Sequence, residues 1–537
     1  MGPTSTYTTQ DLGHLGLVAG MCQELKIAET IDQLLPSTEK HISHGTAACA
    51  MVLNGLGFVN QRLYLVPDFF RNKPVDRLLG PGITAEQLND DTLGRTLDAI
   101  YAANPTAVYA AVAANGCQIL GLKPRYGHLD STSFHVDGQY NSDQPPDEGV
   151  IWITKGYSRD HRPELNQCVL NLIVESQASI PIHMSAASGN SDDKTGFRAL
   201  LNTHIDSLRN VYDCPYMVAD SALYVEKTLK DLATCMVFIT RVPETLSFAK
   251  DLLNRSDVTL MHRIHDTYQY QEVCGIYGEV KQRWIIVYSQ QAYDRDIRTL
   301  NRRVLKQSER EHKAFAKLCR RAFACRKDAQ RAWEKFQQKT LTYTIVPDLD
   351  IREHAHYGKR GKPRQGEQPE RIEYFLTGSV ASCLRTRAEL ERIQGMFILA
   401  TNELDAERLP APEVLQGYKG QSHVEHGFGF LKHPEFLASS LFLKKPERIM
   451  ALLMIMTVCL MVYAALEYRI RQGLQQQGQT ILNQRGTPTD RPTARWVFHC
   501  FVGIHVLLQN GQSVGILNLA EHHWDVINLL GYQAYYT

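Results

Sequence analysis

Apolar residues recur every three to four positions over roughly the first 120 residues of the chain. The pattern is clearest in residues 15–35 and 90–112. Side chains at this spacing share one face of a helix, because an α-helix completes a turn in about 3.6 residues. The pattern therefore predicts a helical N-terminal domain over residues 1–120.

From residue 121 the helical period gives way to short β-rich segments separated by turn residues. Several strands in a row, followed by alternation with helices, predict a mixed α/β sheet, which we assign to residues 121–243. The expected strands are 125–136, 149–158, 166–176, 180–187, 215–220 and 235–242, and the expected helices are 192–210 and 223–233.

The alternation stops at about residue 244. Isolated strand-like segments at 283–289, 341–346 and 371–377 lie on either side of a polar helical stretch. We interpret residues 244–394 as a β-rich domain inserted into the α/β core.

Buried-strand character returns at residue 395, and we expect residues 395–472 to form the second part of the core. Within it, residues 449–466 are an 18-residue apolar run with one mildly polar threonine. Such a run reaches the length of a membrane-spanning helix, but a helix that is apolar on every side is also typical of the centre of a large domain. We interpret it as a buried helix and expect no membrane partner. Residues 473–537 are expected to form a C-terminal tail, whose apolar part at 495–508 packs on the body.

The composition is that of a soluble protein with two to four domains. The chain has 537 residues, of which 44% are hydrophobic and 21% charged. Its twelve cysteines are scattered singly, which favours reduced thiols. The N-terminus has no basic start followed by an apolar core, so we expect no secretory signal and a cytoplasmic location.

Positive charge is concentrated in the predicted insertion. Between Arg295 and Lys339 there are 15 Lys and Arg residues against 5 Asp and Glu residues, although the whole chain carries a net charge of only +1. Apolar residues recur at helical spacing through this stretch, so we expect a basic helical hairpin with one packed stripe. A solvated helix face would carry the same charges, but a second basic segment at 356–366 favours a polyanionic partner. The expected phosphate contacts are Arg302, Arg303, Arg320, Arg321, Lys359 and Arg360.

Three carboxylates are candidates for chemistry, and one of them, Asp220, stands where an α/β sheet presents functional side chains. Asp130 lies in the first β-segment, Asp220 ends a buried strand, and Glu425 lies in a predicted helix. Each aspartate could instead cap a turn. Together, two strand-borne aspartates and one helix-borne glutamate form a set of hard oxygen ligands suited to Mg²⁺ or Mn²⁺ and not to zinc.

Glu425 belongs to the stretch YKGQSHVEHGFGFLK, residues 418–432. The step from Tyr418 to Gln421 is three residues, the next step to Glu425 is four, and the last step to Lys432 is seven. In one continuous helix these steps keep the four side chains within about 60° of one another. We therefore expect a single helix with all four groups on one face.

The ordered set Asp, Asp, Glu, with the spacing Y-x2-R-x3-E-x6-K around the Glu, resembles the insertion-sequence DDE transposases. It is most similar to the group with a Tyr-Arg-Glu-Lys signature and a β-rich insertion before the Glu. In this chain Gln421 stands where the wider group has Arg. Further stretches also resemble the family: GHLDSTSFHV, KGYSRDHRPELNQ, SGNSDD, MVADSALY and GMFILATN.

The resemblance implies a ribonuclease-H-like catalytic core and metal-dependent cleavage at the ends of a mobile DNA element. The freed 3′-hydroxyl would then attack target DNA. Asp130, Asp220 and Glu425 would hold two Mg²⁺ ions, with Mn²⁺ able to substitute, and Tyr418, Gln421 and Lys432 would hold DNA phosphates. The N-terminal domain would bind element ends or pair subunits. The expected partners are double-stranded DNA and further copies of the chain, as a homodimer or higher oligomer at a bacterial nucleoid.

Two other classes of function are compatible with parts of this pattern. A glycoside hydrolase also uses paired carboxylates, but it has no need of a basic domain. A domesticated or decayed relative would bind DNA without cutting it, which the intact carboxylate trio disfavours.

Overall fold

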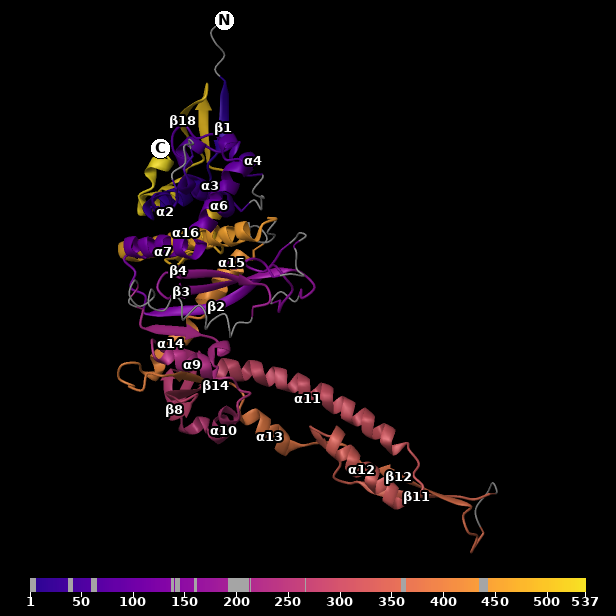
Figure 1. The fold of residues 1–537 in the computed structure, drawn as a ribbon. Coiled ribbons are helices and arrows are strands. Elements are labelled where there is room, and N and C mark those ends of the chain that lie inside the picture. The colour runs from indigo at the N-terminus through magenta and orange to yellow at the C-terminus, as the bar shows by residue number, and fades with distance from the viewer. Residues whose placement is uncertain are drawn as a thin grey trace. The chain divides into compact units, whose positions relative to one another are not determined.

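The structure, a computed structural model, describes residues 6–36, 42–58, 65–136, 140, 145–158, 162–191, 212, 214–265, 267–358, 364–433 and 443–537. Contacts divide the chain into two compact units. Unit 1 comprises residues 1–241, 274–283 and 400–537, and unit 2 comprises residues 242–273 and 284–399. Each unit is described by itself, with the element labels of Figure 1.

The first part of unit 1 is helical, as the apolar periodicity predicts. Polar caps begin several of its helices: the side chains of Ser43 and Asn89 accept hydrogen bonds from the backbone N–H groups of Thr46 and Thr92. One strand, β1 (Tyr7–Asp11), precedes the helices and was not predicted. The helices are α1 (Leu15–Glu24), α2 (Ile27–Leu34), α3 (His44–Leu56), α4 (Val66–Phe70), α5 (Val75–Leu79), α6 (Asp90–Ala102) and α7 (Pro105–Leu120).

Helix α16 (Pro446–Gln477) contains the long apolar run and is buried, as predicted. Its length and composition would suffice to cross a membrane, yet 89% of its most apolar window lies inside the protein. Helices α1, α3, α6 and α7 pack around it (Figure 1). The hydroxyl of Thr457 donates to the carbonyl of Leu453, 2.8 Å away, so the side chain of this threonine is satisfied within the helix.

Residues 473–537 belong to unit 1. Strand β17 (His505–Gln509) pairs with β1 at the other end of the chain and with β18 (Gln512–Leu517), both antiparallel. The rings of Tyr532 and Tyr536 cover Gly20 and Gly16 of α1, where a Cβ atom would lie 2.6 and 2.7 Å from them. The expected packing of residues 495–508 on the body is confirmed. The other elements are β15 (Ile481–Leu482), β16 (Pro488–Thr489), α17 (Ala494–Cys500) and α18 (Glu521–Leu530).

The α/β part of unit 1 is built on five strands in the order β4-β3-β2-β5-β6. The strands β2, β3 and β4 are antiparallel neighbours, whereas β2, β5 and β6 run parallel. The sheet is mixed, as predicted. Its strands are β2 (Tyr126–His135), β3 (Gln167–Glu175), β4 (Pro181–Ser188), β5 (Tyr216–Ala219) and β6 (Val237–Arg241). Helix α9 (Glu226–Ala233) joins β5 to β6.

The strand predicted at 149–158 is absent, apart from an isolated bridge between Thr154 and Gln167. The reason is a close backbone crossing. A Cβ atom on Gly156 would lie 1.9 Å from the carbonyl oxygen of Gly189, so the two glycines bring the loop against the end of β4. The predicted helix at 192–210 lies outside the described residues.

Unit 2 holds the segment predicted as an insertion except residues 274–283, which belong to unit 1. Its strands lie in the order β14-β9-β8-β7, where β7 (His262–His265) and β8 (Tyr268–Tyr277) were not predicted. The remaining strands are β9 (Val280–Ser289), β10 (Thr344–Ile345), β11 (Asp350–His356), β12 (Arg371–Thr377), β13 (Ala381–Ser382) and β14 (Met396–Thr401). The helices are α10 (Ser247–Arg255), α11 (Gln290–Cys319), α12 (Arg326–Thr340) and α13 (Leu384–Arg392).

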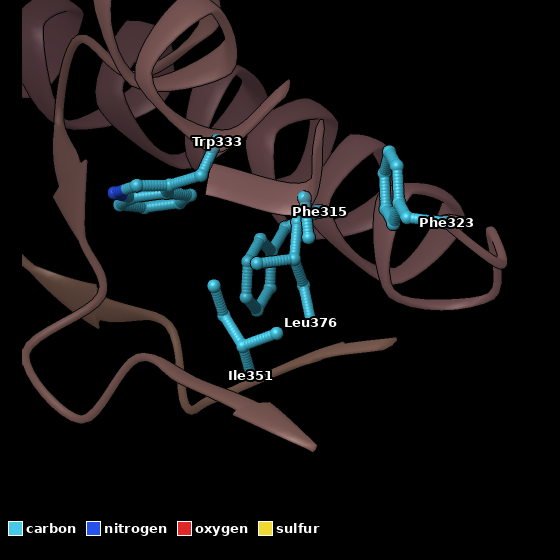
Figure 2. Packing of buried hydrophobic residues seen from close by; sticks show 6 residues of the cluster. Phe315, Phe323, Trp333, Ile351 and Leu376 are labelled. Atoms are coloured by element: carbon cyan, nitrogen blue, oxygen red, sulfur yellow. The ribbon is translucent and has the colours of Figure 1, made fainter. Parts of the chain in front are cut away.

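A small apolar cluster holds the helical part of unit 2 together. Phe315 of α11 and Trp333 of α12 meet edge to face with ring centroids 5.9 Å apart, and Ile351 and Leu376 of the β11–β12 ribbon pack beneath them (Figure 2). The carboxylate of Glu311, fully buried on α11, accepts hydrogen bonds from the backbone N–H groups of residues 342–344. These contacts fix α11 on its neighbours, so its polar face is left for solvent or a partner.

Candidate functional site

Strand register brings Asp130 and Asp220 together in unit 1. Leu129 pairs with Ala219 across β2 and β5, and each aspartate is the next residue along its parallel strand. Neighbouring strands lie about 4.8 Å apart. The two carboxylates predicted from the sequence are therefore adjacent at one edge of the sheet.

Two helices run along the same face of β2. A Cβ atom on Gly417 would lie 2.8 Å from Tyr126, and one on Gly420 would lie 2.6 Å from His128. Alternate residues of a strand share a face, so Asp130 follows Tyr126 and His128 on the face that the helices cover.

The far end of this helical segment also lies on β2. The Nζ atom of Lys432 is 5.7 Å from the centre of the Phe134 ring. The helical segment therefore runs along β2: Gly420 lies over His128, and Lys432 lies over Phe134. Glu425 lies between these two contacts, over the part of the strand that contains Asp130.

The single helix predicted over residues 418–432 is wrong, because the structure has two. Helix α14 (Ala411–Lys419) ends at Gly420 and α15 (Ser422–Leu431) begins after Gln421. The close approach of Gly420 to His128 explains why this position has no side chain. A Cβ atom on Gly427 of α15 would likewise lie 3.0 Å from Leu460 of α16, whereas one on Gly429 would have no neighbour within 4 Å.

Gln421 does not face outward, which contradicts its expected contact with a DNA phosphate. Its side chain is only 7% exposed. Its Nε2 donates a hydrogen bond to the backbone carbonyl of Leu129 at 2.8 Å, inside the protein. The amide thus joins the start of α15 to the residue that precedes Asp130.

Tyr418 lies among the charged groups of this edge. The pKa of its hydroxyl is raised, chiefly by burial and also by the negative charges of Asp220 and Glu425. The positive charge of Arg241 and a hydrogen bond from its guanidinium oppose this shift. Tyr418 therefore interacts electrostatically with two of the three predicted carboxylates and with Arg241, a cation that was not predicted.

Arg241 is the functional candidate that the sequence analysis missed. Ala219 pairs with Thr240 across β5 and β6, so Arg241, the last residue of β6, is in register with Asp220, just as Asp220 is in register with Asp130. The side chain is half-buried. The sequence did carry a signal for it: Arg241 ends a buried strand, as Asp220 ends the predicted strand 215–220, although no motif surrounds it.

The three carboxylates differ in their surroundings. Asp130 is 8% exposed and accepts a hydrogen bond from the N–H of Ser131, and Asp220 accepts one from the N–H of Ala222. Glu425 is exposed. Within the described ranges, no group of three or more His, Cys, Asp and Glu side chains is arranged to hold a metal ion. The structure thus pairs the two aspartates and brings the helix of Glu425 onto β2.

The basic residues predicted to contact DNA fall in two groups. Arg302 and Arg303 lie on α11, Arg320 and Arg321 follow it, and all four are exposed. The guanidinium of Arg321 lies 5.0 Å from the Phe323 ring. Lys359 and Arg360 lie outside the residues that the structure describes.

Comparison with known proteins identifies the family. Residues 122–462 match the family described as "Transposase DDE domain", and residues 7–114 match a domain of unknown function, DUF4277. The chain is similar to a solved piggyBac transposase, in a synaptic complex with hairpin DNA, with 10% identity and a TM-score of 0.36 over 93% of this chain and 82% of that one. No curated protein matches the chain significantly.

The resemblance inferred from the Asp, Asp, Glu order is thereby confirmed. The matched segment contains Asp130, Asp220 and Glu425 and covers more than half of the sequence. The chain belongs to the DDE transposase family.

Proposed function

We propose that this transposase cleaves the ends of its insertion sequence and joins the freed 3′-hydroxyl ends to target DNA. The observation that carries this proposal is the register of β2 and β5, which puts Asp130 and Asp220 side by side beneath the helix that bears Glu425. We assign the core to the ribonuclease-H-like class. The protein would act on DNA in the cytoplasm, at the nucleoid, as a homodimer or higher oligomer.

The donor set fits a pair of hard divalent cations. Asp130, Asp220 and Glu425 would hold two Mg²⁺ ions, for which Mn²⁺ could substitute, because carboxylate oxygens are the ligands that these ions prefer. When bound, such ions activate an attacking water or hydroxyl and stabilise the leaving oxygen. The adjacency of Asp130 and Asp220 supports the assignment, and Glu425 would complete the set from α15.

The cationic and hydroxyl groups beside the carboxylates would orient the DNA strand. Arg241 carries a permanent charge in register with Asp220, and its guanidinium can bind two phosphate oxygens at once. Tyr418, which accepts a hydrogen bond from Arg241, can donate its own proton to a phosphate. Lys432 would add a point charge farther along α15. In this assignment Arg241 supplies the fixed positive charge that the wider group places at the position of Gln421.

The exposed arginines of unit 2 would bind the DNA backbone. Arg302, Arg303, Arg320 and Arg321 lie on or next to a long helix whose apolar side is already packed. Phosphate contacts of this kind fix the position of a protein on DNA without reading its sequence.

The proposal is tested with a plasmid that carries the gene together with its flanking genomic DNA. Purified protein should release or nick the element at its ends when Mg²⁺ is present and should stop when the metal is chelated. Mn²⁺ should restore cleavage at least as well as Mg²⁺. End binding without cleavage under both metals would instead support the alternative, a DNA-binding relative that has lost its catalytic activity.

A further inference from the structure

The start of α15 is attached to the sheet at two points. At the first, Gln421 Nε2 donates to the carbonyl of Leu129 at 2.8 Å. At the second, Nδ1 of His423 lies 2.6 Å from the hydroxyl of Ser179, in the turn between β3 and β4. Both contacts fall within the last turn of chain before Glu425.

The turn that carries Ser179 is itself fixed by a buried carboxylate. Glu175 is fully buried, and its oxygens accept hydrogen bonds from the N–H groups of Gln177, Ala178 and Ile180 at 2.7, 2.7 and 3.0 Å. Ser179 has a φ of +60°, a conformation that costs free energy and persists only where its surroundings hold it. The hydroxyl is therefore presented to α15 from a rigid support.

Glu425 has little packing of its own to define its position, because it is exposed. Its carboxylate can be placed only through the backbone of α15. One helical turn, about 5.4 Å of rise, separates it from Gln421, so a contact that fixes Gln421 also fixes the direction in which Glu425 projects.

We infer that Gln421 and the Ser179–His423 pair form a clamp that positions Glu425 opposite Asp130 for metal binding. The inference rests on the proposed function. It gives Gln421 a positioning role in place of the phosphate contact expected from its place in the signature. Both anchor points belong to the same part of the sheet: Leu129 lies in the strand of Asp130, and Ser179 lies in the turn of the β3–β4 hairpin, which flanks this strand on the side away from Asp220.

The test compares Gln421→Met with the wild-type protein. Methionine keeps the length of the side chain but cannot donate a hydrogen bond. Mn²⁺ binding is measured without DNA from the electron paramagnetic resonance signal of free Mn²⁺. We expect the Mn²⁺ affinity to fall about tenfold, which is the usual loss when a group that orients a metal ligand is removed. The affinity for end DNA in metal-free buffer, and its salt dependence, should be unchanged, because the amide is buried and does not contact DNA.

Two further variants make the result decisive. Glu407→Ala, at an exposed carboxylate outside the site, should bind Mn²⁺ like the wild type. Ser179→Ala should weaken Mn²⁺ binding in the same direction as Gln421→Met, and it carries the test if the methionine variant does not fold.

Each contrary outcome has a distinct meaning. Wild-type Mn²⁺ affinity in both Gln421→Met and Ser179→Ala overturns the clamp and leaves the proposed function standing. A fall in DNA affinity and salt slope in Gln421→Met, with Mn²⁺ binding intact, also overturns it and returns Gln421 to phosphate binding. Mn²⁺ binding by the wild type that Glu425→Gln does not weaken overturns the proposed metal site itself, and the clamp with it.

Discussion

At the scale of single residues, Arg241 changes the electrostatics expected from three carboxylates alone. It lies in register with Asp220 and donates a hydrogen bond to Tyr418. A guanidinium is a cation whose planar fork can bind two phosphate oxygens at once. The same edge of the sheet can therefore attract both metal cations and phosphate anions.

Replacement of Arg241 by Gln should weaken the binding of end DNA by about tenfold at low salt and should flatten the log–log salt dependence by roughly 0.9. The reason is the loss of one phosphate contact and of the counterion that it releases. The measurement is end-DNA affinity at several salt concentrations in metal-free buffer. Arg485→Gln, at an exposed arginine in the turn between β15 and β16, is the matched control, and an equal slope for the two variants would remove Arg241 from the DNA interface.

At the scale of elements, the junction of α14 and α15 decides where Glu425 lies. Gly420 is pressed against His128, and Gln421 is bonded to Leu129. The sequence predicted the residues of this stretch but not its break. Local spacing alone favours one helix through position 420, because a single glycine costs a helix only about 1 kcal/mol. The imidazole of His128, more than 290 positions earlier in the chain, leaves no room for a side chain at position 420.

Gly420→Ala tests this packing. Its Cβ would lie 2.6 Å from the His128 ring, so we expect a loss of about 1–3 kcal/mol in the free energy of unfolding and weaker Mn²⁺ binding. Gly429→Ala, in the same segment but with no neighbour within 4 Å, should gain up to ~1 kcal/mol from its helix propensity. Urea unfolding of both variants provides the comparison. Equal stabilities would show that β2 and the helix junction are not in close contact.

A second element-scale prediction concerns His14, which precedes α1. Burial lowers the pKa of its imidazole to about 4, despite an opposing hydrogen bond to the carbonyl of Leu56. The ring also stacks on Phe498 with centroids 4.3 Å apart. In the unfolded chain a histidine has a pKa of about 6.5. As the pH falls from about 6.5 to about 4, the unfolded state therefore binds a proton that the folded state does not, and stability is lost.

His14→Gln should remove this contribution. The wild-type protein should lose about 2 kcal/mol more than the variant between pH 7 and pH 5. Urea unfolding followed by circular dichroism at the two pH values measures the difference. An equal loss in both proteins would mean that His14 is already accessible to protons in the folded state.

At the scale of the whole molecule, the two units carry different parts of the proposed activity. Unit 1 contains the carboxylates and Arg241, and unit 2 contains the exposed arginines of the α11 region. The apolar side of this region is occupied by the cluster of Phe315, Trp333 and Leu376. Its charges can therefore be removed without disturbing a core.

The double replacement of Arg302 and Arg303 by Gln should leave the stability of the protein within about 0.5 kcal/mol of the wild type. If both arginines contact DNA phosphates, the log–log salt dependence of DNA binding should flatten by about 1.8. Fluorescence anisotropy of labelled DNA across a salt series measures it. An unchanged slope would mean that this helix faces solvent in the DNA complex.

Much of the chain could be predicted because its signals are local. The strands around Asp130 and Asp220 follow from buried β-rich segments, and α16 follows from its uninterrupted apolar run. What could not be predicted depends on partners distant in sequence. Strand β1 exists because β17 pairs with it, almost 500 residues away, and the strand expected at 149–158 is replaced by a crossing of two glycine-containing segments.

The same distinction holds within the candidate site. The order Asp130, Asp220, Glu425 is visible in the sequence, and the strand register then makes the two aspartates neighbours. The position of Gln421 could not be predicted. A glutamine in the sequence can be a buried amide bonded to a carbonyl or an exposed amide bonded to a phosphate, and the local spacing does not distinguish the two. Arg241 shows the converse, since it becomes a candidate through register across β5 and β6 and not through any motif.

The central claim is that Asp130, Asp220 and Glu425 act as one metal-binding set for DNA cleavage. The most direct measurement is strand cleavage of end DNA in Mg²⁺ by Asp130→Asn, Asp220→Asn and Glu425→Gln, with end binding of each variant checked in metal-free buffer. Each variant should bind the ends with wild-type affinity, within about threefold, and should lose cleavage by at least about 100-fold, because each replacement removes a charged metal ligand. A variant that binds DNA and still cleaves at a rate near that of the wild type would contradict the account.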